Sequence, residues 1–129
     1  MKPESRTQPT PSELEILQVL WSRGPSTVRE IHEVLAQHKD LGYTSALKLL
    51  QIMTTKGLVV RSEDQRAHVY SATQPAEKTK QQFAADVLQR VFRGSASQLM
   101  QHVLSGKRGS RQEIDEIRRL LDEYERKLK

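Results

Sequence analysis

Four polar side chains between Gly42 and Gly57 are spaced to lie on one side of a helix, because residues three and four apart share a helical face. They are Thr44, Ser45, Lys48 and Gln51. Threonine and serine hydroxyls can bond to phosphates or base edges, lysine to phosphate or guanine, and glutamine to adenine. This chemistry suits a surface that reads DNA in the major groove. The alternative interpretation is an ordinary solvated helix face.

The same segment carries an apolar stripe, which predicts how the helix attaches to the rest of the protein. Thr44 is expected to cap the N-terminus of the helix, and Gly57 is the residue type that ends helices. Leu47 borders the polar face, where it could either meet a thymine methyl group or belong to the core. The residues of the predicted stripe are Ala46, Leu49, Leu50 and Met53.

Two amphipathic segments precede this helix, and each has a capping-box pattern, a hydroxyl residue followed three positions later by glutamate. The pair Ser12 and Glu15 predicts a helix that ends at Gly24, and the pair Thr27 and Glu30 predicts a second helix to about residue 38. Two helices joined by a short polar turn are typical of a helix-turn-helix. Thr27, at the start of the second helix, is placed for a phosphate contact.

A pair of strands is predicted after the third helix, at Leu58–Arg61 and Ala67–Ser71, with a polar turn between them. Three helices followed by a β-hairpin give the order of a winged helix-turn-helix, in which the hairpin is the wing. Arg61, Arg66 and His68 lie on this hairpin, and we expect them to contact the DNA backbone. The predicted fold is therefore mainly α, with a winged helix-turn-helix in residues 1–75.

Residues 76–129 predict three further helices, which we interpret as a helical dimerisation domain. Ser97 is expected to begin the middle helix, and the capping box of Ser110 and Glu113 the last one. A segment of about 54 residues buries little apolar surface alone, so a second copy of the chain is predicted to cover its stripes. The alternative is a monomer that folds back on the winged helix. The predicted dimerisation residues are Phe83, Val87, Val91, Leu99, Val103, Ile117, Leu120, Leu121 and Tyr124.

The charge balance permits a nucleic-acid partner without requiring one. The formal net charge is +5, from 21 Lys and Arg against 16 Asp and Glu. Residues 1–75 hold 9 basic and 8 acidic side chains, a net of +1, whereas residues 76–129 hold 12 and 8, a net of +4. The nearly neutral N-terminal part slightly favours the alternative hypothesis, a winged helix used only for protein–protein contact.

Motifs for catalysis are missing from the sequence, so an enzyme is not predicted. There is no P-loop, no dinucleotide-binding glycine motif and no zinc-protease motif. The chain has no cysteine, and its four histidines have no ligand spacing, so no metal or cofactor is expected. No apolar run approaches a membrane span and no secretory segment follows the start, which predicts a cytoplasmic protein without membrane insertion.

Taken together, four stretches of this sequence resemble the BlaI/MecI/CopY family of bacterial transcriptional repressors, the penicillinase-repressor group. These are PSELEILQVLW (Pro11–Trp21), TVREIHEVL (Thr27–Leu35), GYTSALKLLQIMTTKGLV (Gly42–Val59) and RAHVYSA (Arg66–Ala72). The resemblance covers nearly the whole chain. It implies a homodimer whose winged helices bind a palindromic operator in double-stranded DNA and block transcription.

The resemblance also implies a way in which repression could be relieved. In antibiotic-responsive members, a membrane sensor with a protease domain triggers cleavage of the repressor in its dimerisation domain, at an Asn-Phe bond in the penicillinase type. The matching position here looks like His102-Val103, which departs from that pattern. Copper-responsive members carry cysteine pairs near the C-terminus, and this chain has none. The operator sequence, the regulated genes and the inducing signal do not follow from the sequence.

Overall fold

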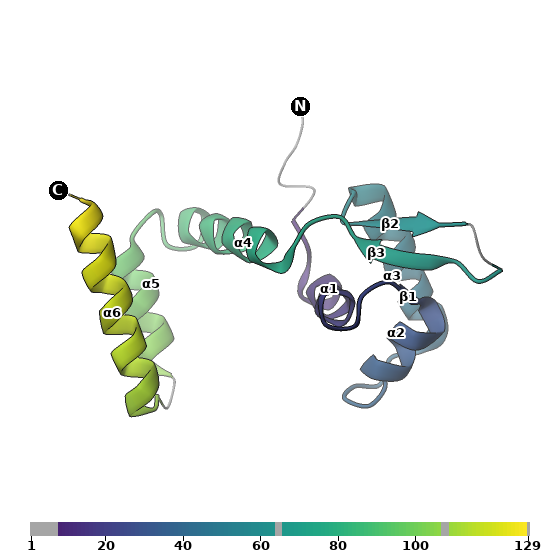
Figure 1. The fold of residues 1–129 in the computed structure, drawn as a ribbon, viewed down its shortest axis with the longest axis horizontal. Coiled ribbons are helices and arrows are strands. Elements are labelled where there is room, and N and C mark those ends of the chain that lie inside the picture. Colours follow the sequence, from purple (N-terminus) through teal and green to yellow (C-terminus); the bar gives the residue numbers. More distant parts are fainter. Residues whose placement is uncertain (1–7, 64–65, 107–108, 129) are drawn as a thin grey trace. The chain divides into compact units, whose positions relative to one another are not determined.

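A computed structural model describes residues 8–63, 66–106 and 109–128 (Figure 1). The described chain is mainly helical with a small antiparallel sheet, as predicted. Its elements are α1 (Pro11–Arg23), β1 (Ser26–Thr27), α2 (Val28–Leu35), α3 (Tyr43–Lys56), β2 (Val59–Ser62), β3 (Val69–Ala72), α4 (Ala76–Arg90), α5 (Ala96–Ser105) and α6 (Arg111–Lys127).

The chain divides into two compact units between Asp86 and Val87, inside α4. We call the described residues up to Asp86 the winged-helix unit and those from Val87 onward the C-terminal unit. The domain boundary predicted from the sequence, between residues 75 and 76, falls at the start of α4 and stays a prediction.

The first helix begins two residues earlier than its predicted capping box. Thr10 is the N-cap: its hydroxyl accepts a hydrogen bond from the Glu13 amide at 3.2 Å, and the Glu13 carboxylate accepts one from the Thr10 amide at 2.9 Å. The predicted box of Ser12 and Glu15 is therefore wrong. The physical reason is Pro11, whose fixed φ and missing N–H favour the first helical position and so place the cap at Thr10.

The predicted capping box of α2 is confirmed, whereas the predicted cap of α3 is wrong. The Thr27 hydroxyl accepts from the Glu30 amide at 3.2 Å, and the Glu30 carboxylate accepts from the Thr27 amide at 2.9 Å. The N-cap of α3 is Gly42, with extended backbone and no side-chain cap, so Thr44 lies within the first turn. Gly57 ends α3 as predicted, at φ 84°, where glycine carries no Cβ penalty.

The sheet has a third strand that the sequence analysis did not predict. Strand β1 is only Ser26–Thr27, and it pairs with β3 in the sheet order β1-β3-β2, all antiparallel. The register sets Thr27 opposite Val69 and Arg61 opposite Tyr70. The short strand thus holds the start of α2 against the wing. Residues 64 and 65 of the predicted turn lie outside the described residues.

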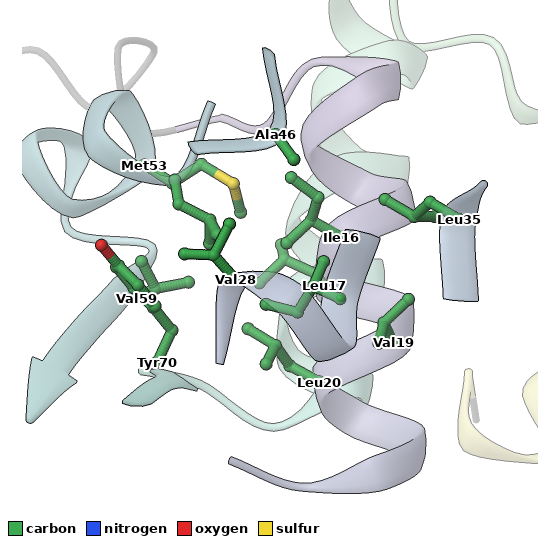
Figure 2. Packing of buried hydrophobic residues seen from close by; sticks show 12 residues of the cluster. Ile16, Leu17, Val19, Leu20, Val28, Leu35, Ala46, Met53, Val59 and Tyr70 are labelled. Carbon is green, nitrogen blue, oxygen red and sulfur yellow. The ribbon is translucent and has the colours of Figure 1, made fainter. Parts of the chain in front are cut away.

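The core of the winged-helix unit lies between the three helices and the sheet (Figure 2). Leu49, predicted in the buried stripe of α3, is only partly buried and packs against this core. Trp21 packs there too, and its indole N–H donates to the Gln74 carbonyl at 3.0 Å. The fully buried apolar side chains include Ile16, Leu17, Ile31, Ala46, Leu50, Met53, Val59 and Tyr70.

The C-terminal unit, by contrast, leaves most of its apolar side chains uncovered. Helices α5 and α6 contain no buried residue, and Leu120, Leu121 and Tyr124 are each at least 60% exposed. Ser95 caps α5, with its hydroxyl 3.2 Å from the Gln98 amide, so the predicted start at Ser97 is two residues late. Ser110 caps α6 as predicted.

Candidate nucleic-acid interface

The outer face of α3 presents the four polar residues predicted from the sequence. Thr44, Ser45, Lys48 and Gln51 are all exposed, because Ala46, Leu50 and Met53 on the opposite side are completely buried. Within the part of the chain that the structure describes, none of the four side chains has a protein partner. Their hydrogen-bonding groups are therefore available to a ligand that covers this face.

His32 fixes the turn that leads into this helix. Its Nε2 atom lies 2.7 Å from the Leu41 carbonyl oxygen, and its ring meets the Tyr43 ring edge-on, with 6.0 Å between ring centroids. Leu41 lies in the loop that follows α2, just before the N-cap Gly42, and Tyr43 is the first residue of α3. These contacts hold the N-terminus of α3 against α2, so the polar face has a defined direction.

A hollow of about 670 Å³ separates α3 from the returning strand of the wing. It brings together three residues predicted separately to touch DNA: Thr27 before α2, Leu47 on α3 and His68 beside β3. Arg29 and Tyr43 line the same hollow, although the sequence analysis did not select them. We name this feature the wing hollow; its lining side chains include Thr27, Arg29, Tyr43, Leu47, Ala67 and His68.

Arg29 could have been found from its position, since it follows Thr27 by two residues and lies in the first turn of α2. Tyr43 could have been found only from the true start of α3. Both are exposed, and the guanidinium and phenol groups can donate hydrogen bonds to phosphate oxygens. They extend the candidate interface from the outer face of α3 into the wing hollow.

Thr27 is already engaged within the protein. Its hydroxyl and amide form the capping box with Glu30, whose carboxylate also lies 3.6 Å from the guanidinium of Arg23. The N-terminus of α2 is therefore already capped by the Glu30 carboxylate. A phosphate approaching here would meet the first-turn amides and the Arg29 side chain rather than a free Thr27 amide.

On the other side of the wing, a second hollow of about 510 Å³ is lined by Gln51 of α3 and Arg61 of β2. Arg61 is paired with Glu63 at 2.6 Å. The Glu63 carboxylate, and next the Tyr70 hydroxyl, raise the pKa of Arg61, while the Arg61 guanidinium lowers the pKa of Glu63. The charge of Arg61 is thus partly balanced inside the wing, whereas Arg66 and His68 are exposed and form no ion pair within the described ranges.

Leu47 is half-buried and packs against the hydrophobic core, so it contributes to the floor of the wing hollow. The remaining predicted residues lie in the C-terminal unit, except Phe83, which lies in the part of α4 that belongs to the winged-helix unit. His102 and Val103 are exposed within α5, the His102 ring lies 5.6 Å from the Phe92 ring, and Val103 shares an apolar hollow of about 140 Å³ with Ile114 and Ile117.

Neither a metal site nor a membrane span emerges from the described ranges. No group of three or more His, Asp or Glu side chains there could hold a metal ion. None of the helices in those ranges is long and apolar enough to cross a membrane.

Comparison with known proteins gives consistent matches over most of the chain. The family model described as the penicillinase repressor matches residues 9–123. The transcriptional regulator BlaI of Mycobacterium tuberculosis is 35% identical over 115 residues, which are 88% of this chain and 82% of that protein. The methicillin resistance regulatory protein MecI of Staphylococcus aureus is 21% identical over 111 residues, 86% of this chain and 90% of that protein. The solution structure of the DNA-binding domain of the repressor BlaI covers 59% of this chain and 90% of that domain, at 21% identity with a TM-score of 0.50, a likeness that supports the winged-helix fold.

Proposed function

Because this chain belongs to the penicillinase repressor family, we propose that it is a DNA-binding transcriptional repressor that recognises its operator with the outer face of α3. It is a regulator and not an enzyme. The observation that carries the proposal for α3 is the row of exposed polar side chains whose hydrogen-bonding groups have no partner within the described chain. The hypothesis of a module that binds only proteins is not favoured, because one relative is named a transcriptional regulator and another a methicillin resistance regulatory protein.

In this proposal, Lys48 and Gln51 read base edges. They lie three residues apart on the exposed face, so both side chains can reach one half-site. Glutamine can form two hydrogen bonds with adenine, and lysine can donate to guanine or to a nearby phosphate. Thr44 and Ser45, in the first turn of α3, contact base edges or the adjacent phosphates.

The wing and the wing hollow supply contacts to the sugar-phosphate backbone. Arg66 and His68 are exposed between β2 and β3, and Arg29 and Tyr43 line the wing hollow between α2, α3 and the wing. Contacts of this kind fix the position of a protein on DNA and contribute affinity that falls as salt rises. Arg61 contributes less, because Glu63 balances its charge.

Two copies of the chain bind together through the C-terminal unit. The exposed apolar side chains of α5 and α6 support this part of the proposal, since a surface of this kind usually marks an interaction site. A two-fold dimer would place its two α3 helices in successive major grooves, about 34 Å apart. The operator is then an inverted repeat. We place this binding in the cytoplasm.

Relief of repression by a sensor protease is a further part of the proposal, and the cut would fall between Leu99 and Gly106. This stretch lies in α5 and at its end, so the backbone must unwind locally before it can enter a protease site. Mass spectrometry of induced cells would locate the fragments. Full-length protein that persists under the true inducer would contradict this route.

The central experiment is selection of DNA from a random pool by the purified full-length chain. Sequencing of the retained DNA should give an inverted repeat, and fluorescence anisotropy should show tight binding to that repeat and weaker binding to a scrambled duplex. Equal affinity for both duplexes, or no binding at all, would contradict the proposed function. Cross-linking of the bound complex should show two chains per operator.

A further inference from the structure

Ile52 is an exposed apolar residue on a helix face that is otherwise polar. Its side chain is 41% exposed, and it does not belong to the hydrophobic core of the unit. In the described part of the winged-helix unit, the large apolar residues with comparable exposure are Tyr43, Ile52 and Val60, and all three lie on α3 or β2. The elements that carry the proposed interface are therefore also the ones with uncovered apolar side chains.

The helical spacing puts Ile52 among the proposed base-reading residues. It follows Lys48 by four positions and Ser45 by seven. Residues four apart are neighbours on a helix surface, and residues seven apart lie on the same side two turns away. When this face of α3 enters the major groove, Ile52 enters with it and loses its contact with water.

Leu47 is the residue for which the sequence allowed a thymine contact, and its surroundings make it the weaker candidate. It packs partly against the core and lines the wing hollow, which the proposed function assigns to backbone contacts. Ile52 has no such core contact. Of the two aliphatic side chains, Ile52 is the one with more surface left to be covered by DNA.

Resting on the proposed function, we propose that Ile52 determines specificity by packing on the C5-methyl group of a thymine in each half-site. In the major groove, thymine is the base that offers an apolar group at its edge. Guanine, adenine and cytosine present polar groups, which would lose water against isoleucine without gaining a hydrogen bond. Ile52 thus favours thymine at one position beside the bases that Lys48 and Gln51 read.

The test replaces each thymine of the selected operator in turn with deoxyuridine, which lacks only the methyl group. The affinity of the wild-type chain should fall about fourfold when the contacted thymine of a half-site is replaced, because one buried methyl group is lost. The same substitution should have no effect on Ile52→Ala. Val60→Ala is the matched control, because it shortens another exposed β-branched side chain in the same unit and should keep the full deoxyuridine penalty.

The outcomes distinguish a failure of this inference from a failure of the function on which it rests. A wild-type chain that binds its operator but tolerates deoxyuridine at every position would overturn the role of Ile52, as would an equal penalty in Ile52→Ala. The wild-type scan needs no variant, so a folding defect in Ile52→Ala would not rescue the idea. A wild-type chain that selects no operator would overturn the proposed function and this inference with it.

Discussion

Nζ of Lys56 lies 2.7 Å from Oε1 of Glu13, and this ion pair joins the last turn of α3 to the first turn of α1. The Glu13 side chain is only 3% exposed, and its carboxylate also accepts a hydrogen bond from the Thr10 amide. One buried carboxylate therefore caps α1 and anchors the end of the proposed recognition helix. The direction of α3 depends on this contact at its C-terminus and on His32 at its N-terminus.

Removal of the cation should destabilise the unit, because the buried Glu13 carboxylate would lose its cationic partner. We expect Lys56→Ala to lower the free energy of unfolding by about 1–3 kcal/mol, the usual cost for a charged hydrogen bond inside a protein. Lys39→Ala is the control, since Lys39 lies 2.8 Å from Glu15 of the same helix but both side chains are more exposed. That change should cost at most about 1 kcal/mol. Urea unfolding measures both, and equal losses would contradict a special role for Glu13.

Base reading and backbone contact should give different signatures at Gln51 and Arg66. Gln51→Ala should relax the preference at particular base pairs, at a cost of about 1–3 kcal/mol if the contact is bidentate. Arg66→Ala should weaken binding to all sequences and lower the slope of log affinity against log salt by about one unit. Gln18→Ala, an exposed position on α1, serves as the control and should change neither. Equal weakening of operator and random DNA by Gln51→Ala would contradict base reading by this face.

Glu63 should restrain the DNA affinity of the wing, because it holds the Arg61 guanidinium at 2.6 Å. We expect Glu63→Gln to bind random DNA more tightly and to steepen the salt dependence by up to about one unit. Glu33→Gln makes the same charge change at an exposed site of α2 with no ion pair in the described ranges, and should have a smaller effect. Similar gains in both variants would mean that net charge alone matters.

The pH dependence of this restraint follows from the lowered pKa of Glu63, which Arg61 causes. The pKa of Glu63 is lower in the folded chain than in the unfolded chain. The ion pair's contribution to folding stability is therefore complete above the unfolded pKa and disappears as the pH falls through the folded pKa. The difference in DNA affinity between wild type and Glu63→Gln should therefore stay constant from neutral pH down to the ordinary glutamate pKa. Anisotropy titrations at constant ionic strength across that range measure it, and a difference that fades near neutral pH would contradict the pairing.

Dimerisation should fail when charges are placed on the apolar face of α6. Leu120→Asp combined with Leu121→Asp should give monomers in sedimentation velocity and weaken operator binding, because buried carboxylates without partners oppose association. Arg119→Asp is the control on the same helix and should leave the dimer intact. A wild-type chain that sediments as a monomer at micromolar concentration would contradict the proposed dimer.

The sequence alone determined most of the helices and the position of the polar face on α3. Helical periodicity is a local property, so the spacing of residues was sufficient to assign Ala46, Leu50 and Met53 to the core and Lys48 and Gln51 to the surface. The ends of α1 and α3 could also be predicted from Gly24 and Gly57, because both residues adopt positive φ values, which favour glycine.

Other features were decided by the tertiary structure, because they depend on residues that are distant in sequence. Strand β1 has two residues and no pattern of its own, and it exists because it pairs with β3. The Glu13–Lys56 ion pair joins residues 43 positions apart. The wing hollow likewise collects Arg29, Tyr43 and His68 from three separate segments.

Ile52 shows the same division at a single residue. The sequence gives its residue type and its position on the helix. From the residue type alone, however, an apolar residue on a helix is normally assigned to a core. Helical spacing places Ile52 beside Lys48, and the packing of the folded chain decided that its side chain stays 41% exposed while Leu47 packs against the core. The physical reason is that periodicity gives the side of a helix on which a residue lies, whereas exposure depends on how neighbouring elements cover that side.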